Sequence, residues 1–378
     1  MITFAVAVKE ILMVVYALDT EHPILSSQAS LVSAISKRVE SLHVITGSKG
    51  KFNIPNNVSV YVLSPKNRNH TPRLLLIFLK YWRLIQISRK IIKNMRPDVV
   101  FVHMSDSYAA ILSLFNFLKS VKIYLWYAHT HPSTWVKLCS FMGVSFLSST
   151  RGSFPLQDCK VHLLGQIVDE SRFPFLRSRR CISHLSSIKF CHVGRLDKSK
   201  NVHRILMALT EIQESERKEI FFNHYGNAAS KDTEYRDCLN NRVYRLKESS
   251  RVNVELKPSV MNVEVSNILN SHDVFVHAYE GSLDKALIEA TLAGIPVITA
   301  NREYIRIFGS WSSEIDADSE LSVSQMITRE WVALASMNCR DERKERLRRA
   351  HLAQKFYTEK IWLDNFFQVL DIEASSSS

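Results

Sequence analysis

The chain alternates short runs of β-branched and apolar residues with longer amphipathic stretches, and this alternation occurs twice along its 378 residues. Short buried apolar runs are typical of parallel strands, and the amphipathic stretches between them suit the helices that cross from one parallel strand to the next. We therefore predict an α/β protein of two domains, each a parallel sheet covered by helices. A chain of this length is long for one domain and comfortable for two.

Both halves of the chain contain strand and helix candidates in alternation. In the first half we predict strands at residues 11–16, 42–46, 58–63, 99–103, 122–127 and 144–147, and helices at 27–40, 72–94, 108–118 and 133–139. In the second half we predict strands at 188–193, 220–225, 252–256, 274–277 and 296–299, and helices at 199–211, 232–247, 263–270, 283–293, 323–336 and 358–370.

Residues 169–187 interrupt this alternation. They contain Pro174 and a cluster of arginines with little periodicity, and we interpret them as the interdomain linker and the entry to the second domain. The predicted domains are therefore residues 1–170 and 171–355, with a C-terminal helix at 356–374 assigned to the first domain.

The formal net charge of +12 predicts an anionic partner, which could be nucleic acid, anionic lipid or a phosphorylated small molecule. No nucleic-acid recognition motif and no platform of alternating aromatic and basic residues is present, so we predict no nucleic-acid partner. The six scattered cysteines lack metal-ligand spacing and are typical of free thiols in a reducing cytoplasm. No apolar run is long enough to span a bilayer, and we expect a cytoplasmic protein.

The first segment with chemical character is the sequence from His192 to Asn201, where a predicted strand ends and a helix begins. Ligands bind at such edges of parallel sheets because helix amides and the helix dipole point into the crevice. Gly194 would let a ligand approach the backbone, Arg195 offers a planar fork for phosphate oxygens, and Lys200 adds a point charge. A solvated basic turn is the alternative interpretation of this segment alone.

The second segment, residues 280–298, also follows a strand and opens a helix. Gly281 and Ser282 would expose backbone N–H groups, which together form an anion site. Lys285 lies in the first helical turn, where a cation opposes the helix dipole unless it meets an anion such as phosphate. Glu289 lies in an apolar run, where a carboxylate needs a partner, and it could accept hydrogen bonds from the two hydroxyls of a ribose.

Together these segments resemble the donor-binding half of the retaining glycosyltransferase family 4, within the glycosyl transferases group 1, whose members adopt the GT-B fold. Arg195 and Lys200 match that family's Gly-Arg-x(4)-Lys element, and Gly294, Pro296, Val297 and Ile298 match its Gly-x-Pro-Val-Ile element. Residues 165–169 with Phe173 resemble its interdomain segment, and residues 127–129 resemble the segment that carries its N-domain histidine. The resemblance implies two facing Rossmann-like domains, with the acceptor on the side of the first.

Two departures from the family pattern concern the site. Counting back eight residues from Glu289 gives Gly281, so the family's first glutamate is replaced in register and Glu280 lies one residue early. Glu280 could still reach the sugar, or Ser282 and backbone amides could replace the missing glutamate. The Gly-Ser-x-Asp-Lys sequence resembles a sub-pattern of the family. The glycine pair usual after the first strand is also absent, and residues 22–28 stand there.

The resemblance implies transfer of a sugar from a nucleotide-diphosphate sugar with retained anomeric configuration and without a metal or other cofactor. The catalytic candidates are His129, Arg195, Lys200 and Glu289, with His129 positioning the sugar. The donor-binding candidates are Gly194, Glu280, Gly281, Ser282, Leu283, Asp284 and Lys285. The expected acceptor is a glycan or lipid-linked molecule in cell-surface polysaccharide or lipopolysaccharide biosynthesis. The single Asp-x-Asp, at 316–318, lies outside both segments and is interpreted as a solvated loop.

Three other functions remain open at this point. A nucleotide-sugar 2-epimerase or an inverting transferase would share the same fold and donor. A non-catalytic nucleotide-sugar-binding protein is compatible with the missing first glutamate.

The predicted helix at 72–94 suggests a further partner. Leu74, Ile77, Phe78, Tyr81, Ile85 and Ile92 share one face, which we assign to the core. The opposite face mixes Lys80, Arg83, Lys90 and Lys93 with Leu75, Leu79 and Trp82, and this mixture suits an anionic membrane surface. Peripheral attachment to the inner face of the cell membrane is the prediction, and a helix partly buried on both sides is the alternative.

Overall fold

The computed structural model describes residues 8–22, 25–63, 72–115, 121–216, 218–229 and 232–375. The chain forms two compact units: unit 1 is Met1–Gly165 with Lys360–Ser378, and unit 2 is Gln166–Glu359. The change from one unit to the other thus lies five residues before the predicted boundary at 170 and four residues after the predicted boundary at 355. Residues 23–24 of the segment at 22–28, and residues 116–118 of the predicted helix at 108–118, lie outside the described residues.

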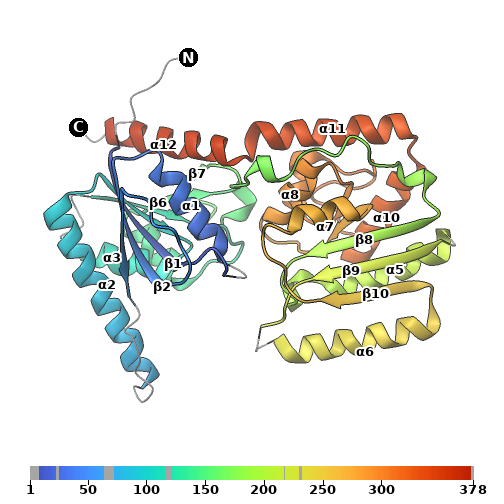
Figure 1. Ribbon diagram of the computed structural model, residues 1–378, viewed down its shortest axis with the longest axis horizontal. Coiled ribbons are helices and arrows are strands. Elements are labelled where there is room, and N and C mark those ends of the chain that lie inside the picture. Colours follow the sequence, from blue (N-terminus) through green and yellow to red (C-terminus); the bar gives the residue numbers. More distant parts are fainter. Residues whose placement is uncertain are drawn as a thin grey trace. The chain divides into compact units, whose positions relative to one another are not determined.

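Unit 1 is built on a parallel sheet, and Figure 1 shows its strands in blue to green with helices against them. The described strands pair in the order β3-β2-β1-β4-β5-β6-β7. They are β1 (Glu10–Leu18), β2 (Ser41–Lys49), β3 (Val58–Val62), β4 (Val99–His103), β5 (Lys122–Trp126), β6 (Ser145–Ser148) and β7 (Val161–Leu163). The helices are α1 (Ser26–Ser36), α2 (Arg73–Met95), α3 (Asp106–Leu114), α4 (Thr134–Phe141) and α12 (Glu359–Ser375).

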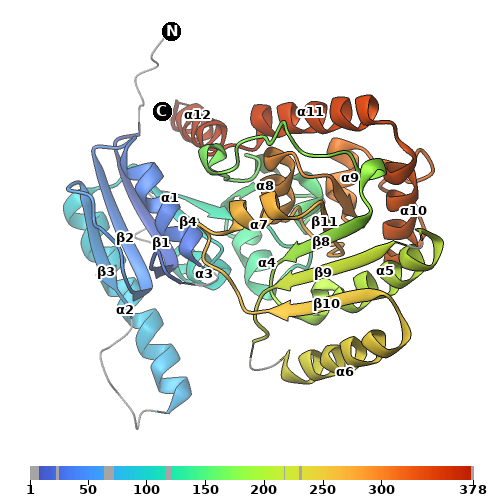
Figure 2. The same cartoon turned by 45° about the vertical axis from the view of Figure 1, so that its right-hand side comes forward.

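Unit 2 repeats the same architecture on a smaller sheet, with the described strands in the order β10-β9-β8-β11-β12, all parallel. The strands are β8 (Ser187–Val193), β9 (Glu219–Tyr225), β10 (Val252–Lys257), β11 (Val274–His277) and β12 (Val297–Thr299). The helices are α5 (Val202–Glu216), α6 (Thr233–Ser249), α7 (Val265–Ser271), α8 (Lys285–Ala293), α9 (Arg302–Phe308), α10 (Val323–Ser336) and α11 (Cys339–Phe356). Figure 2 shows α5 and α6 beside strands β8, β9 and β10.

Both strand orders are Rossmann-like, because in each unit the first strand lies centrally and the chain winds outward from it in two directions. The expected fold class, α/β with two Rossmann-like parallel sheets, is therefore confirmed. Sequence analysis did not predict β7 or α9, which are too short to show a clear period.

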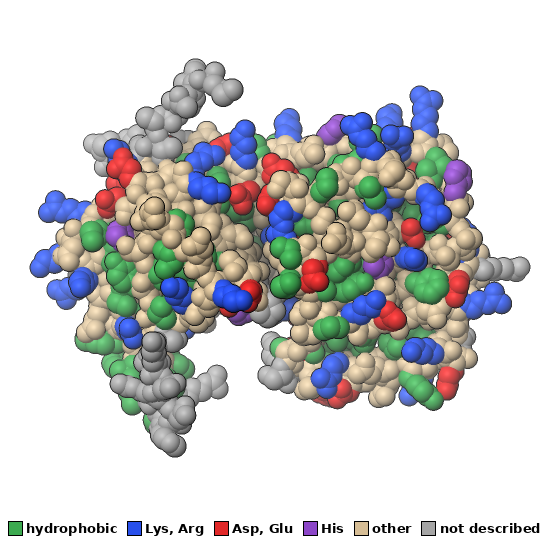
Figure 3. All heavy atoms as spheres, viewed as in Figure 1, with side chains coloured by type: hydrophobic (Ala, Val, Ile, Leu, Met, Phe, Trp, Pro, Cys, Tyr) green, Lys and Arg blue, Asp and Glu red, His purple; other side chains and the backbone are tan. Residues whose placement is uncertain are grey.

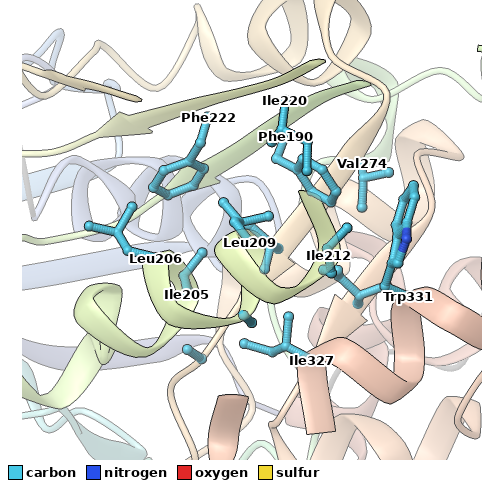
Figure 4. Close-up of a cluster of buried hydrophobic side chains, with 14 of the residues drawn as sticks. Phe190, Ile205, Leu206, Leu209, Ile212, Ile220, Phe222, Val274, Ile327 and Trp331 are labelled. Atoms are coloured by element: carbon cyan, nitrogen blue, oxygen red, sulfur yellow. The ribbon is translucent and has the colours of Figure 1, made fainter. Parts of the chain in front are cut away.

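The core of unit 2 lies between its sheet and helices α5 and α10. Phe190 and Phe222 from the strands meet Leu209 and Ile212 from α5, and Trp331 of α10 closes the cluster (Figure 4). Trp331 is fully buried and its indole N–H donates to Glu216 at 3.2 Å. Helix α5 carries these apolar residues at three- and four-residue spacing, so one face packs on the sheet.

Unit 1 is completed by the last helix of the chain. Helix α12 brings Trp362 and Phe366 against the sheet, where the Trp362 ring lies 5.5 Å from Trp126 and the Phe366 ring lies 4.7 Å from Phe101. Because Trp362 and Phe366 are almost fully buried, this helix is part of the core of unit 1.

The segment at 169–187, interpreted as a linker, is packed into unit 2. The guanidinium of Arg179 donates to the backbone carbonyls of Leu269 and His272, and that of Arg172 donates to the carbonyl of Asn262. Because this segment contains Pro174 and clustered arginines, it lacks the hydrophobic periodicity that indicates a regular helix or strand. Hydrogen bonds from side chains to backbone carbonyls hold this segment against unit 2, although it forms no regular α-helix.

The arginine-rich stretch near 343–349 lies within α11, and two of its arginines are buried. Arg346 pairs with buried Glu342 at 3.1 Å, and the Arg349 guanidinium lies 4.0 Å from the centre of the Trp311 ring. Part of the positive charge of the sequence is therefore used inside unit 2, not on a surface that meets an anionic partner.

The core face predicted for α2 is wrong at its N-terminal end. Leu74, Ile77 and Phe78 are exposed, and the residues that α2 buries are Leu84, Ser88, Ile91 and Ile92, which lie farther along the helix. Periodicity identifies an apolar face but does not tell whether a partner reaches all of it. Unit 1 covers only the C-terminal part of α2.

Candidate functional site

The two segments singled out in the second half of the sequence meet at one point of the unit 2 sheet. Strands β8 and β11 are hydrogen-bonded neighbours, and the chain leaves them in opposite directions across the sheet. This position is the topological switch point, where the loops after the two strands diverge and leave a crevice. Residues 194–201 follow β8 and residues 278–284 follow β11.

The loop after β8 is fixed by the neighbouring strand β9. The amide of Gly194 donates to the carbonyl of Tyr225 at 3.0 Å, and the amide of Leu196 donates to the carbonyl of Asn227 at 3.1 Å. A Cβ atom at Gly226 would lie 1.7 Å from the carbonyl oxygen of Gly194, so this position has room only for glycine. Arg195 is about half exposed, and its Nε lies 3.4 Å from Asp197.

Lys200 is not a free cation, because it is buried and forms an ion pair with Asp284. Its Nζ lies 2.5 Å from Asp284 Oδ2 and 4.1 Å from the centre of the Tyr279 ring. The pair joins the short helix η5 (Lys198–Lys200) to the residue immediately before α8. The structure thus brings Lys200 and Asp284 together from 84 positions apart.

Asp284 has a second partner, His277 at the end of β11. The His277 Nε2 lies 3.3 Å from Asp284 Oδ2, and its Nδ1 lies 3.2 Å from the hydroxyl of Thr299. Burial alone would raise the pKa of Asp284, but the charge of Lys200 and the hydrogen bond from His277 hold that pKa well below its usual range. Burial lowers the pKa of His277 more than Asp284 raises it, so the imidazole is neutral at pH 7.

Three amides that sequence analysis did not single out hold the loop after β11. The side-chain amide of Asn301 donates to the carbonyls of Tyr279, Gly281 and Ser282 at 2.8, 3.2 and 3.2 Å. That of Asn201 donates to Ala278 at 3.1 Å, and that of Gln166 donates to Leu283 at 2.6 Å. Asn201, with φ of +51°, follows Lys200 directly. No local pattern distinguishes such residues from other loop asparagines and glutamines.

Helix α8 begins without a side-chain cap. Asp284 is its N-cap residue, a position where aspartate ordinarily accepts a hydrogen bond from the first helical amides. Here its side chain makes no such bond and points to Lys200 and His277 instead. The first turn of α8 therefore keeps backbone amides available to an anion.

The acidic candidates differ in their surroundings. Glu289 is buried, and its Oε1 lies 3.5 Å from Lys285 Nζ, one helical turn earlier. Burial raises the pKa of Glu289 despite the opposing charges of Lys285 and Arg172. Glu280 is exposed at the tip of the loop. Leu283 is buried in the core, so only its backbone faces the loop, and the ring of Tyr279 covers Gly281.

Two further buried histidines lie beneath these loops. His192 on β8 and His224 on β9 are paired in register, and their Nδ1 atoms are 2.9 Å apart. Their Nε2 atoms are buried and have no hydrogen-bond partner in the described part of the chain. Burial lowers the pKa of both, that of His224 to about 4. The sequence signal for this pair is a histidine two residues before a glycine at the end of each strand, His192 before Gly194 and His224 before Gly226.

His129 lies in unit 1, immediately beyond the carboxyl end of β5. It is exposed, and its ring meets the edge of Tyr127 at a centre distance of 5.2 Å. In place of the expected glycine pair, Gln28 of α1 accepts hydrogen bonds from the amides of Tyr16 and Ala17 at 3.0 Å each, at the end of β1.

Among the described residues, no three His, Cys, Asp or Glu side chains are grouped so that they could hold a metal ion. Asp316 and Asp318 are exposed, and the latter is 3.4 Å from Arg306. A hollow of about 940 Å³ lies along α6, lined by residues that include Glu234, Asp237 and Arg245. It belongs to one helix face away from the strand ends, so it is not the site that the motifs indicate.

The buried histidines make a prediction for stability. The unfolded chain protonates histidine near pH 6.5, whereas folded His224 resists protonation until about pH 4. Between these values the unfolded state binds more protons than the folded state, so the free energy of unfolding falls as the pH is lowered. The contribution of neutral His224 is fully present above about pH 6.5. We expect His224→Gln to reduce the pH dependence of the unfolding free energy by about 1.4 kcal/mol per pH unit in this range. Urea unfolding from pH 7 to 4 measures it, with exposed His351→Gln as control. Identical pH dependence in wild type and His224→Gln would contradict the assignment.

Residues 183–307 match the model of the family described as glycosyl transferases group 1. This range contains both loops of the switch point and every candidate residue of unit 2. No curated protein matches the sequence. The match lies within unit 2, and it extends from just before β8 into α9.

Solved structures resemble the chain over nearly its whole length. HepE from Anabaena, in complex with UDP and glucose, has a TM-score of 0.68 at 13% identity, covering 96% of this chain and 99% of its own. Sucrose-phosphate synthase from Thermosynechococcus elongatus has a TM-score of 0.72 at 12% identity, covering 98% and 100%. A glycosyltransferase from Rickettsia africae has a TM-score of 0.68 at 11% identity, covering 98% and 100%. At these identities the likeness shows the fold. The chain therefore has the GT-B fold, and residues 183–307 of its second unit are similar to the glycosyl transferases group 1 family.

Proposed function

We propose that this protein is a retaining, metal-independent glycosyltransferase that moves a sugar from a nucleoside-diphosphate sugar to a glycan or lipid-linked acceptor in cell-surface polysaccharide or lipopolysaccharide biosynthesis. The observation that carries the proposal is the pair of loops at the unit 2 switch point. Lys200 is ion-paired with Asp284, the N-cap residue of α8, and Lys285 is the first residue of that helix, while Arg195 belongs to the loop that leads to Lys200. A diphosphate is the chemical group that fits three cations and a helix N-terminus.

The same residues supply the chemistry that the reaction needs. When the bond between the sugar and the diphosphate breaks, negative charge develops on the leaving phosphate oxygen. Cations and amides held in advance stabilise that charge, and this electrostatic contribution carries most of the catalysis. In the retaining reaction the acceptor hydroxyl attacks on the face that the diphosphate leaves, and its proton passes to the departing phosphate oxygen. His129 keeps its predicted role as a group that positions the sugar.

Glu289 fits the recognition of the nucleoside better than a role in proton transfer. Its carboxylate is buried beside Lys285 on the first turns of α8. Two carboxylate oxygens can accept hydrogen bonds from neighbouring ribose hydroxyls. HepE was crystallised with UDP and glucose, which makes UDP and UDP-glucose the first nucleotides to test for this chain.

The first test measures binding of UDP, GDP and ADP, and hydrolysis of the corresponding nucleotide sugars. We expect Arg195→Ala to weaken binding of the preferred nucleotide at least tenfold, because a charge-assisted hydrogen bond contributes about 1.5–3 kcal/mol. Exposed Lys198→Ala, three residues away on η5, is the matched control and should change binding less than threefold. Wild-type affinity and turnover in Arg195→Ala would show that this loop does not bind the diphosphate.

The second test separates the two glutamates. We expect Glu289→Gln to weaken nucleotide binding more than Glu280→Gln does, since Glu289 is buried next to Lys285 whereas Glu280 is exposed. Titration calorimetry with the same nucleotide gives both affinities. Equal and large losses would mean that Glu280 also contacts the donor. A loss only in Glu280→Gln would overturn the assignment of Glu289.

Product analysis distinguishes the alternatives that share this fold. A transferase requires an acceptor, and NMR of the product reports whether the anomeric configuration is retained. A 2-epimerase would convert the nucleotide sugar without an acceptor, and a binding protein would give no product at all.

The acceptor side of the proposal rests on the N-terminal half of α2. Leu74, Leu75, Ile77, Phe78 and Trp82 are exposed by 41–81% of their surface. Apolar side chains gather over this end of α2 at the lower left of Figure 3. Unpartnered apolar surface of this kind marks an interaction site, and exposed Arg83, Lys90 and Lys93 lie on the same helix. We propose that this surface binds an anionic membrane.

Two observations refine that proposal. No described helix is long and apolar enough to cross a bilayer. A cavity of about 620 Å³ lies between α2 and β3, lined by Arg83 and Lys90 together with apolar residues that include Ile87 and Ile91. Such a lining suits the headgroup and upper chain of an anionic lipid. Lys80, by contrast, packs over the ring of Tyr108 at 5.1 Å and is not part of this surface.

We expect replacement of Arg83, Lys90 and Lys93 by Gln to reduce binding to phosphatidylglycerol vesicles by roughly two orders of magnitude, because each basic residue contributes about 1 kcal/mol at an anionic surface. Replacement of Leu74, Phe78 and Trp82 by Ser should also release the protein, while nucleotide-sugar hydrolysis remains. Vesicle sedimentation measures both. Phe141→Ser is the matched control, since Phe141 is 90% exposed on α4. Unchanged binding in both α2 variants would leave soluble acceptors as the better proposal.

A further inference from the structure

The ion pair between Lys200 and Asp284 is a largely buried charged contact at the switch point. The side chains of Lys200 and Asp284 are 11% and 22% exposed. A buried charge without a counter-charge is costly, so each of these residues stabilises the other in the absence of a ligand. Asp284 is also the N-cap residue of α8, yet its carboxylate makes no bond to that helix.

The hydrogen bonds behind Asp284 have one consistent direction. A carboxylate only accepts, so the neutral imidazole of His277 must carry its proton on Nε2, which faces Asp284. Its Nδ1 is then an acceptor, and the hydroxyl of Thr299 donates to it. The Thr299 oxygen in turn accepts from the amide of Asn301 at 2.9 Å. Each hydrogen in this series of bonds has a defined acceptor, from the backbone amide of Asn301 to Lys200.

The chain of bonds fixes where the Lys200 ammonium can lie. Lysine is a flexible point charge, and without partners it would adopt many positions. Asp284 holds it on one side, and the face of the Tyr279 ring lies 4.1 Å away on another. The charged groups around His277 are Lys200 and Asp284, and neutral His192 lies at a ring distance of 5.8 Å. Lys200 and Asp284 are therefore the charged pair that the imidazole of His277 faces.

We propose that Asp284 and His277 are positioning residues: Asp284 holds the Lys200 ammonium at the start of α8 for the donor diphosphate, and His277, supported by Thr299, holds Asp284. This inference rests on the proposed function, in which Lys200 binds the diphosphate. It assigns the aspartate of the Gly-Ser-x-Asp-Lys sequence a role through Lys200, and not a contact with the donor. It also explains why this N-cap aspartate leaves the first turn of α8 uncapped.

A double-mutant cycle in the full-length protein tests the proposal. Titration calorimetry measures the affinity of each variant for UDP, GDP and ADP. We expect Lys200→Met to weaken binding of the preferred nucleotide about tenfold or more, and Asp284→Asn to weaken it by a similar factor. Asp284→Asn combined with Lys200→Met should bind within twofold of Lys200→Met alone, because Asp284 acts only through Lys200. An equal further loss from Asp284→Asn in both backgrounds would show a general structural role and overturn the proposal.

His277 has its own conservative test. Glutamine can present a donor near the position of Nε2, whereas phenylalanine cannot, so His277→Gln should bind the nucleotide several-fold more tightly than His277→Phe. Equal affinities of these two variants would contradict the role of the imidazole. Thermal unfolding without nucleotide shows whether the variants are folded. Asp284→Asn leaves Lys200 unpaired and should lower the Tm. Adding Lys200→Met to Asp284→Asn should restore part of that loss.

Nucleotide binding and the coupling between Asp284 and Lys200 distinguish failure of the proposed function from failure of the positioning role. If wild type binds none of the nucleoside diphosphates, the proposed function is wrong and this inference falls with it. If wild type and Lys200→Met differ as expected but the cycle shows no coupling to Asp284, the function stands and only the positioning role is overturned.

Discussion

The contact between Lys200 and Asp284 joins the two loops that leave the sheet of unit 2 at its switch point. One loop follows β8 and the other follows β11, and these strands are neighbours although residues 202–277 separate the loops in sequence. Because the ion pair is buried, removing either partner would leave an uncompensated charge. The positions of η5 and of the first turn of α8 therefore depend on each other, and both elements carry residues proposed to meet the donor.

The electrostatics of this edge of the sheet follow from the same contact. Neutral histidines occupy the carboxyl ends of β8, β9 and β11, because burial lowers the pKa values of His192, His224 and His277. Asp284 compensates the charge of Lys200, and Glu289 compensates that of Lys285. An anionic donor would thus bind at a site whose cations are already held in place. The donor would not need to order the side chains of Lys200 and Lys285 when it binds.

The fold could be predicted from the sequence because strands such as β4 and β11 are short, mostly apolar runs. The runs at 99–103 and 274–277 coincide with β4 and β11 at both ends. The loops were found for a related reason, since parallel strands bring their carboxyl ends to one edge and the motifs follow strands. The pairing of Lys200 with Asp284, the roles of Asn201 and Asn301, and the histidine pair depend on contacts between distant segments. No local spacing reveals such contacts.

Helix α2 shows the opposite limit. Its apolar residues have helical spacing, which is typical of a core face, but unit 1 covers only its C-terminal part. Residues 169–187 were interpreted as a linker because they lack periodicity, yet hydrogen bonds from Arg172 and Arg179 to backbone carbonyls anchor them in unit 2. Periodicity reports on regular elements packed along their whole length. It does not report on exposed apolar surface or on irregular segments held by side chains.

Binding of a nucleoside diphosphate at the switch point of unit 2 would change the backbone hydrogen exchange of the full-length protein. With saturating UDP, or whichever nucleoside diphosphate binds, exchange should slow at residues 194–201 and at residues 281–288, where amides of the loop and of the first turn of α8 would meet the phosphates. The hollow along α6 should be unaffected. Protection confined to α6, or no protection in either loop at saturation, would contradict the account.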